Sequence, residues 1–361
     1  METINKAKIL LIGYGYWGQI WYKTLRKSGY LAVVVDPIFK TQISQPGDNG
    51  MGFVNLDGKY GWSGTDELKP FDFTHAIIAT PPSTHLEIYK ELKEKFNIKD
   101  NKILVEKPVG MNYEEAYQMK DCCHNLVWIY DVVYRNVKNI VKSGLLGDIL
   151  TYQSSRASMG PRIRTDVSII EDYLFHDIYL YLDMMGSRFR DLDTEISINY
   201  RDLRRSHFRD HDSIIKDDTI TVGLIDSQGS HFTHIEMFSS WIYPKKERKI
   251  VIVGTKGSLI WDNNSIFINN SKYKKFEDSL QKDNYGNIGY ELTLEEPREP
   301  AVDFVGDKSN LEKLLEDFVG KTLFSGEEEL RIKSFASKQK SLVISTHKII
   351  DKIKNYGVTN D

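Results

Sequence analysis

The stretch Ala7-Lys8-Ile9-Leu10-Leu11-Ile12-Gly13-Tyr14-Gly15-Tyr16-Trp17-Gly18 decides how the first part of this 361-residue chain folds. Residues 7–12 are apolar enough for a buried strand, and residues 16–27 place apolar side chains on one side of a helix. A second apolar run, 31–35, completes a strand, helix, strand unit of about thirty residues. Two such strands joined by a helix run parallel, so the stretch predicts a parallel sheet.

The alternation of strand and helix continues to about residue 126. We expect a strand over 74–79, a helix over 83–95, a strand over 102–106 and a helix over 112–124. Residues 41–64 are rich in Gly, Pro, Asn and Ser, which indicates a shortened or irregular crossover there. The sequence therefore predicts a doubly wound parallel α/β sheet of the Rossmann type over residues 1–126.

After about residue 126 the pattern changes to strands in succession. We expect them at 148–157, 193–200, 218–226, 231–240 and 248–254, interrupted by one helix at about 167–185. Polar segments without a clear period, 201–217 and 263–300, indicate long loops, and helices are expected at about 309–319 and 327–354. Residues 127–361 are thus expected to form an α+β domain with a large, mainly antiparallel open sheet for substrate binding and oligomerisation. Its C-terminal helices are candidates to pack back on the first domain.

Charge and composition exclude several classes of function. The 48 basic and 51 acidic residues give a formal charge of −3, too little field to hold a nucleic acid. The only cysteines, Cys122 and Cys123, are adjacent, so they give neither a disulfide framework nor a spaced thiolate metal site. No run of 18 apolar residues occurs, and Gly13 and Gly15 cut short the N-terminal apolar run. We expect a cytoplasmic protein without a membrane segment or a metal.

The glycines of residues 13–18 follow the pattern GxGxxG between a strand and a helix. In that context Gly13 makes a tight turn, Gly15 lets the backbone approach a pyrophosphate, and Gly18 lets helix and strand pack closely. Tyr16 and Trp17, in the same turn, are further candidates for cofactor contact. The alternative is a glycine turn that binds nothing.

Asp36 ends the second strand, where a dinucleotide fold places an acid that accepts hydrogen bonds from the adenosine ribose. A 2′-phosphate there would meet a like charge, so Asp36 favours NAD over NADP. A carboxylate that only caps the turn before Pro37 is the alternative.

Two further segments lie at the ends of predicted parallel strands, where doubly wound sheets bind their ligands. They contribute the candidate cofactor residues Thr80, Pro81, His85, Glu106 and Lys107. A lysine there can donate to a ribose hydroxyl, and its charge favours the alkoxide that develops when hydride leaves carbon. The alternative is a solvated lysine paired with Glu106.

In the second half, Asp172 and His176 are four residues apart and so share one face of the predicted helix. An imidazole oriented by a carboxylate is a suitable general base for an alcohol proton. The alternative is a buried histidine that is satisfied by a neighbouring aspartate.

Taken in order, these landmarks resemble the glucose–fructose oxidoreductase, inositol dehydrogenase and rhizopine-catabolism family of NAD(P)-dependent oxidoreductases, Gfo/Idh/MocA. The matching landmarks are GYGYWG at 13–18, ATPPSTH at 79–85, VEKP at 105–108, the pair Asp172 and His176, and IVGTKG at 252–257. The resemblance implies that Lys107 bridges substrate and nicotinamide ribose, that His176 exchanges the hydroxyl proton and that Asp172 orients them. It also implies a cis bond between Lys107 and Pro108.

One subgroup of that family, which resembles dehydrogenases of sugars and nucleotide-linked sugars, shares further landmarks. These are Ser155-Arg156, Arg164-x-Asp166, His176-Asp177 and Ser240-Trp241 before Arg248. The candidate substrate residues are Tyr130, Asp131, Arg156, Arg164 and Tyr179. Arg156 and Arg164 suit a phosphate, and equally suit ordinary surface ion pairs. Where relatives often carry Tyr-Asn, this chain has Tyr130-Asp131, which leaves the substrate class open.

The resulting expectation is an NAD-dependent oxidoreductase that acts on a secondary ring hydroxyl or ketone of a sugar, inositol or nucleotide-linked sugar, as a homodimer or homotetramer. Three alternatives stay open. They are an NAD-dependent glycosidase of the same family, a non-catalytic NAD-binding sensor, and a metal-dependent lyase or isomerase, for which no convincing ligand spacing is present.

Overall fold

The computed structural model describes residues 7–36, 51–54, 72–159, 166–186, 196–200, 219–228, 231–263, 265–269, 280–282, 288–292, 308–319 and 328–358. The chain divides into two compact units. Unit 1 comprises residues 1–127 and 307–344, and unit 2 comprises residues 128–306 and 345–361. The predicted Arg164 and the loop at 201–217 lie outside the described residues.

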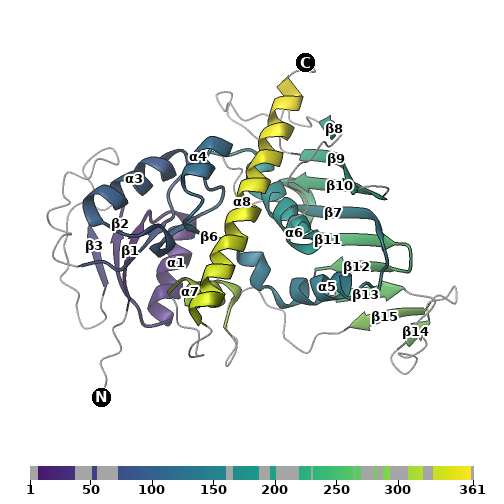
Figure 1. Ribbon diagram of the computed structural model, residues 1–361, viewed down its shortest axis with the longest axis horizontal. Helices are drawn as coiled ribbons and strands as arrows, with labels where there is room; N and C mark the ends of the chain where they lie inside the picture. Colours follow the sequence, from purple (N-terminus) through teal and green to yellow (C-terminus); the bar gives the residue numbers. More distant parts are fainter. Residues whose placement is uncertain are drawn as a thin grey trace. The chain divides into compact units, whose positions relative to one another are not determined.

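Unit 1 is built on a parallel sheet (Figure 1), as the sequence predicts. The strands follow the order β3-β2-β1-β4-β5-β6, the order of a dinucleotide-binding doubly wound fold, and each neighbouring pair is parallel. The strands are β1 (Lys8–Ile12), β2 (Leu31–Val35), β3 (Met51–Val54), β4 (His75–Ile78), β5 (Ile103–Val105) and β6 (Cys123–His124). Strand β3 lies inside the stretch predicted to be irregular.

The helical segments of unit 1 follow the predicted alternation, with one correction. They are α1 (Tyr16–Lys27), the 3₁₀ turns η2 (Pro82–Thr84) and η3 (Asp100–Lys102), α3 (His85–Phe96), α4 (Tyr113–Gln118) and α7 (Asn310–Val319). Helix α1 buries Trp21 and Leu25 on one side, four residues apart. The helix predicted over 112–124 is wrong at its C-terminal end, because α4 ends at Gln118 and the last two residues form the edge strand β6.

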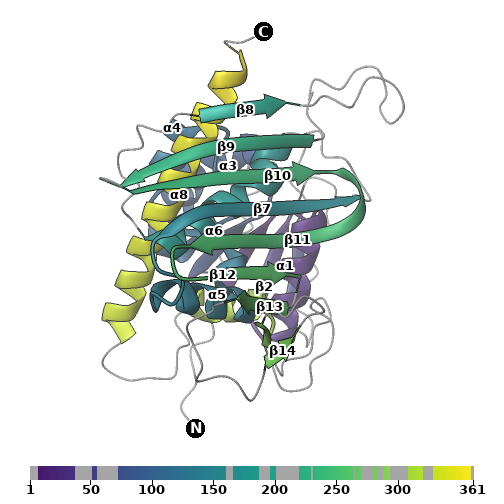
Figure 2. The same ribbon diagram turned by 90° about the vertical axis from the view of Figure 1, so that its right-hand side faces the viewer.

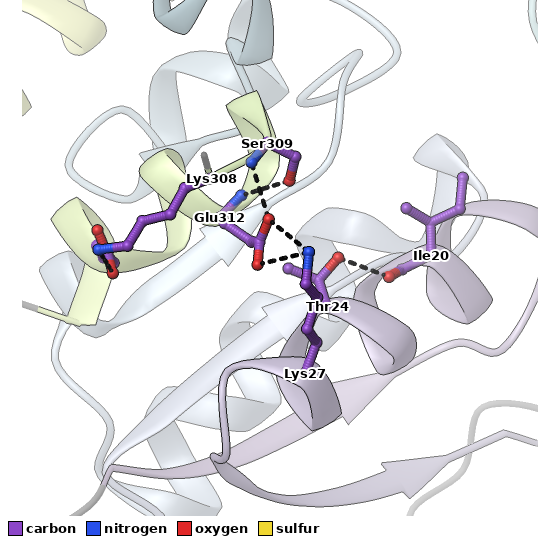
Figure 3. A network of polar contacts seen from close by, with 7 residues as sticks. Ile20, Thr24, Lys27, Lys308, Ser309 and Glu312 are labelled. Atoms are coloured by element: carbon purple, nitrogen blue, oxygen red, sulfur yellow. Dashed lines mark hydrogen bonds and ion pairs between the residues drawn. The ribbon is translucent and has the colours of Figure 1, made fainter. Parts of the chain in front are cut away.

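A capping box fixes the start of α7 (Figure 3). The backbone N–H of Ser309 donates to Oε2 of Glu312 over 2.8 Å, and the N–H of Glu312 donates back to Oγ of Ser309 over 3.3 Å. Lys27 of α1 adds an ion pair to Glu312 at 3.4 Å. Two N–H groups that the helix itself leaves unpaired are therefore satisfied, and α7 is tied to α1.

The edge strand β6 is covered by a side chain instead of another strand. Gln339, in helix α8 (Glu328–Val358), accepts a hydrogen bond from the His124 N–H and donates one to the His124 carbonyl, both over 3.2 Å. The residues of α8 up to Ile344 belong to unit 1, and those from Ser345 belong to unit 2. The side-chain amide thus takes the place of a strand backbone at this position.

Unit 2 contains the mainly antiparallel open sheet that the sequence predicts. Figure 2 shows its strands, which follow the order β14-β15-β13-β12-β11-β7-β10-β9-β8. Among the described strands of this sheet, only β7 and β10 pair in parallel. The strands are β7 (Ile149–Met159), β8 (Ile196–Tyr200), β9 (Thr219–Gln228), β10 (His231–Ser240), β11 (Ile242–Gly254), β12 (Ser258–Asp262), β13 (Ser265–Asn269), β14 (Leu280–Lys282) and β15 (Ile288–Leu292). The prediction of a long loop over 263–300 is wrong, since β13, β14 and β15 lie there.

Two helices lie on one face of this sheet, behind it in Figure 2. They are α5 (Val132–Lys142) and α6 (Phe175–Met185), and α6 follows a π-helical turn, η5 (Ile170–Leu174). The sheet face turned towards the viewer carries no helix of the described part of unit 2, and Phe232, Val253 and Phe267 are exposed apolar residues of the sheet. The homodimer or homotetramer expected from the sequence stays a prediction.

Helix α5 and the 3₁₀ turn before it, η4 (Val127–Tyr130), are not predicted from the sequence. Four of the eleven residues of α5 are valines, which have low helix propensity, but Val133 and Val137 are buried one helical turn apart. None of the helices in the described ranges is long and apolar enough to span a membrane.

Candidate active site

The glycine loop of unit 1 has the geometry of a phosphate-binding turn. Gly13 has φ +94° and donates its N–H to the Val35 carbonyl over 2.8 Å. A β-carbon on Gly13 or Gly18 would clash with backbone, whereas one on Gly15 would meet no atom within 4 Å. Open space at Gly15, at the start of α1, is what a dinucleotide pyrophosphate requires. The loop therefore fits NAD.

The first residues of α1 present their side chains beside this loop. Tyr16 is 77% exposed and Trp17 is half-buried, and their rings meet edge to face with centroids 6.1 Å apart. Both remain available to a molecule bound at the loop.

Asp36 is tied to the glycine loop. Its Oδ2 accepts a 2.6 Å hydrogen bond from the backbone N–H of Tyr14, and the residue is buried. The carboxylate thus lies beside the loop that would hold the pyrophosphate, at the end of β2. This position suits the ribose-binding acid predicted from the sequence.

The segment after β4 packs against the glycine loop, because a β-carbon on Gly13 would lie 2.7 Å from the Ala79 carbonyl oxygen. Thr80 is buried and accepts a hydrogen bond from the Thr84 hydroxyl over 2.8 Å, while Pro81 is exposed. Of the candidates in this segment, Pro81 is the one at the surface.

His85 is fully buried and joins two backbone segments. Its Nδ1 lies 3.1 Å from the Val109 carbonyl and its Nε2 lies 2.9 Å from the Thr80 carbonyl. Both carbonyl oxygens are acceptors, so each ring nitrogen that carries a hydrogen can donate to the carbonyl beside it. His85 therefore holds the end of β4 against the segment that follows Lys107, and its ring does not reach the surface.

Glu106 anchors the end of β5. Its Oε1 accepts hydrogen bonds from Trp21 Nε1 and from Asn125 Nδ2, each over 2.6 Å. Burial raises the pKa of Glu106, against the opposite effect of these two donors and of the Lys107 charge. Both hydrogen bonds hold the strand end, and with it the next residue, in place.

Lys107 follows directly and is 7% exposed, so it is not the solvated lysine of the alternative interpretation. The Lys107–Pro108 bond is cis, as the resemblance implies. A lysine at the carboxyl end of the parallel strand β5 (Ile103–Val105) lies where doubly wound sheets bind their ligands.

Asp172 and His176 belong to unit 2 and lie where the π-helical turn passes into α6. They are 9% and 8% exposed. Oδ2 of Asp172 accepts a 3.2 Å hydrogen bond from Trp241 Nε1, and Nδ1 of His176 lies 3.3 Å from the Tyr179 hydroxyl. π-helical turns are rare and occur frequently at functional sites.

Tyr179 connects His176 to the backbone of Trp128. The Tyr179 hydroxyl accepts a 3.3 Å hydrogen bond from the Trp128 N–H, and burial raises the pKa of Tyr179. The phenol therefore stays protonated near neutral pH. The Trp128 ring meets the His176 ring edge to face, with centroids 6.4 Å apart.

The sequence leaves two roles open for Arg156, a contact to a phosphate and a surface ion pair. The structure contains an ion pair, but it is buried. Nε of Arg156 contacts both carboxylate oxygens of Asp177 at 3.1 and 3.2 Å, and Nη2 donates to Oδ1 over 2.9 Å. This paired geometry fixes Arg156 on β7 against α6.

Tyr130 and Asp131 lie at the start of α5. Tyr130 is buried, with the Arg135 guanidinium 5.5 Å from its ring centroid. Oδ1 of Asp131 accepts the Tyr134 N–H over 3.0 Å, so Asp131 is the N-cap of α5. This capping role was missed because α5 itself was missed.

Trp128 and Arg248 were not among the predicted site residues, although both lie next to them. The Arg248 guanidinium carbon is 3.6 Å from the centroid of the Trp128 ring, and that of Arg156 is 5.4 Å away. The position of Arg248 after Ser240-Trp241 was the available signal, since Arg248 itself lies in the charged run of residues 245–249. The described residues contain no group of three or more His, Cys, Asp or Glu side chains that would hold a metal.

The comparisons with known proteins agree with this geometry. Residues 7–133 match a family model, GFO_IDH_MocA, described as an oxidoreductase family with an NAD-binding Rossmann fold. This match confirms the resemblance seen in the sequence over these residues, and the family description names NAD as the bound cofactor. A search of curated proteins gave no match.

Solved structures share the fold over nearly the whole chain. An oxidoreductase from Sinorhizobium meliloti aligns with a TM-score of 0.69 at 13% identity, over 98% of both chains. Levoglucosan dehydrogenase in complex with NADH aligns with a TM-score of 0.67 at 13% identity, over 98% of this chain and 97% of that one. UDP-N-acetylglucosamine 3-dehydrogenase from Acidithiobacillus ferrooxidans aligns with a TM-score of 0.61 at 15% identity, over 94% and 95%. At these identities the likeness shows the fold.

Proposed function

We propose that this chain is an NAD-dependent dehydrogenase that oxidises a secondary ring hydroxyl of a sugar, inositol or nucleotide-linked sugar, or reduces the matching ketone. The observation that carries the proposal is the buried Lys107 at the carboxyl end of β5, in a domain of an NAD-binding oxidoreductase family. A lysine at this edge can donate to a ribose hydroxyl and can stabilise a developing alkoxide.

NAD, when bound, accepts or supplies the hydride. Lys107 donates to the substrate oxygen and stabilises the negative charge that develops there. His176 takes the hydroxyl proton at Nε2, since its Nδ1 lies against the Tyr179 hydroxyl. Asp172, whose Oδ2 is fixed by Trp241, orients the substrate or the imidazole.

The substrate class is inferred from relatives of the same fold. Levoglucosan dehydrogenase and UDP-N-acetylglucosamine 3-dehydrogenase act, by their names, on a sugar and on a nucleotide-linked sugar. NAD in preference to NADP is part of the proposal, because Asp36 lies beside the glycine loop.

The test is to incubate the purified protein with NAD and a panel of free sugars, inositols and UDP- or dTDP-sugars, and to follow NADH absorbance. We expect NADH with at least one ring alcohol, and its loss in a folded His176→Ala variant. Hydrolysis of a glycoside without net NADH would indicate the glycosidase instead. NAD binding without turnover on any member would indicate a sensor.

A further inference from the structure

Two arginines of unit 2 face each other across neighbouring strands. Arg248 of β11 and Arg156 of β7 are directly opposite partners in the antiparallel ladder. Directly opposite residues project from the same face of a sheet, and like charges at such positions destabilise it. A negatively charged partner for each arginine would offset this repulsion.

Only one of the two has a counter-charge in the part of the chain that the structure describes. Arg156 is paired with Asp177, as shown above. Arg248 forms no ion pair with a described residue, and its buried Nε has no hydrogen-bond partner there. Burial, and then the Arg156 charge, lower the pKa of Arg248 to about 9, while Asp131, Asp177 and Tyr179 act in the opposite direction. Arg248 is therefore still a cation at neutral pH, without a direct anionic partner among the described residues.

Trp128 holds the Arg248 guanidinium by its flat face. At 3.6 Å from the ring centroid the contact is a close cation–π interaction. The N–H groups of a guanidinium lie in its plane, so contact of the ring with its face does not use them, and of these donors only the one on Nε is buried. A guanidinium held in this way presents a fork of donors that matches a carboxylate or a phosphate.

The same tryptophan contacts the candidate base. The Trp128 ring packs against His176, and the Trp128 N–H donates to the Tyr179 hydroxyl that lies beside His176 Nδ1. The Trp128 ring therefore contacts both His176 and the Arg248 guanidinium, so a molecule bound at His176 lies close to the N–H donors of Arg248.

We propose that Arg248, stacked on Trp128, binds an anionic group of the substrate, a phosphate or a carboxylate. This inference rests on the proposed function and narrows it: the sugar carries a negative charge, as sugar nucleotides, sugar phosphates and uronic acids do. The bound anion supplies the counter-charge that Arg248 otherwise lacks and offsets its repulsion with Arg156. Arg248 is thus a specificity-determining residue.

The test is calorimetric titration in the presence of saturating NAD, which occupies the nucleotide site. The probes are UDP and D-glucuronate, with uridine and D-glucose as their respective uncharged counterparts, and inorganic phosphate alone. We expect at least one anionic probe to bind at least tenfold more tightly than its uncharged counterpart. UDP or phosphate would identify a phosphate, and D-glucuronate a carboxylate.

Arg248→Gln should abolish that preference, and Lys249→Gln is the matched control because Lys249 is the next residue of β11 and projects from the opposite face. Arg248→Lys keeps the positive charge but loses the planar fork, so its affinity for the anionic probe should lie between that of the wild type and that of Arg248→Gln. This variant tests the proposal if Arg248→Gln does not fold. Equal binding of charged and uncharged probes, no binding of any anion, or unchanged binding in Arg248→Gln would overturn the proposal.

These titrations need no turnover, so they are independent of the dehydrogenase assay. A protein that oxidises only neutral sugars and binds no anion would remove this inference and leave the proposed function. A protein that binds anions through Arg248 without any oxidation would remove the proposed function instead.

Discussion

The carbonyl oxygen of Gly13 lies 2.1 Å from the position that a β-carbon on Gly18 would occupy. No side chain can be added there without moving the first strand or the first helix. Gly15, three residues earlier, has no neighbour within 4 Å of such a carbon. Gly18 is therefore required by the packing of β1 against α1, whereas the protein itself leaves room for a side chain at Gly15.

This contrast predicts opposite effects of two alanine substitutions. Gly18→Ala should destabilise the protein by roughly 1–3 kcal/mol, as overpacking does. Gly15→Ala should leave the thermal midpoint nearly unchanged and weaken NAD binding by roughly tenfold or more, about 1.4 kcal/mol. Thermal unfolding and fluorescence titration with NAD measure the two effects. If Gly15→Ala binds NAD as the wild type does, the loop does not hold the pyrophosphate.

The proposed proton transfer predicts graded losses of turnover. Folded His176→Ala should lose roughly 10²–10⁴-fold in kcat with little change in NAD affinity, because it removes positioned acid–base catalysis. Lys107→Ala should lose at least as much and also weaken NAD binding, because the lysine is proposed to touch both substrate and ribose. Asp172→Asn should fall between these variants and the wild type. Near wild-type turnover in both His176→Ala and Lys107→Ala would place the chemistry elsewhere.

Cofactor choice should depend on the charge of Asp36 and not only on its hydrogen bond to Tyr14. Asp36→Asn keeps an acceptor for the Tyr14 N–H but loses the charge, so the ratio of NAD to NADP affinity should fall by roughly tenfold or more. Asp36→Ala removes both and should weaken both cofactors. Calorimetric titration with each cofactor gives the ratios. Tighter binding of NADP than of NAD by the wild type would contradict the assignment.

Most helices and strands follow from local sequence patterns. The wrong or absent predictions concern segments whose secondary structure is determined by tertiary contacts. The apolar runs and the glycine loop predict β1, α1 and β2, because strand and helix periods are strong over these residues. Helix α5 is unpredictable from propensity, since its valines disfavour a helix and only burial of Val133 and Val137 and the cap at Asp131 favour it. Strands β14 and β15 have three and five residues, too short for a clear alternation.

The candidate site shows the same division. Residues that belong to local motifs, such as Lys107 and His176, are recognisable from sequence order. Arg248 belongs to a sequence landmark, after Ser240-Trp241, but its cross-strand pairing with Arg156 and its contact with the Trp128 ring, 120 residues earlier in the chain, are not recognisable from the sequence. Such contacts have no sequence period.

Acidification should destabilise unit 1 through its buried histidines. Burial lowers the pKa of His124 to about 4, and burial together with Lys102 lowers that of His75 to about 3. The unfolded chain takes up these protons near pH 6.5, so the free energy of unfolding falls as the pH drops from about 6.5 to about 4. Urea unfolding at pH 7.5 and pH 5 should show a smaller loss for His124→Asn than for the wild type. His234→Asn, at an exposed position, should match the wild type.

The start of α7 should depend more on its capping box than on its ion pair. Ser309→Ala removes the acceptor for the Glu312 N–H and should cost about 1 kcal/mol. Lys27→Met removes an ion pair whose lysine side chain is 61% exposed, and exposed pairs contribute between about 0 and 1 kcal/mol. Chemical denaturation of the two variants compares the costs. A larger loss in Lys27→Met would mean that the contact to α1 outweighs the cap.

Gln339 and His124 have a consequence for how the protein behaves at high concentration. An edge strand exposes N–H and C=O groups that can template another chain, and this is a common route to aggregation. The Gln339 amide occupies both of these groups on His124, so the open end of the parallel sheet is blocked at that residue. Loss of the Gln339 side chain from α8 would then expose the edge strand β6 to pairing with another chain, although the sequence of the sheet itself is unchanged.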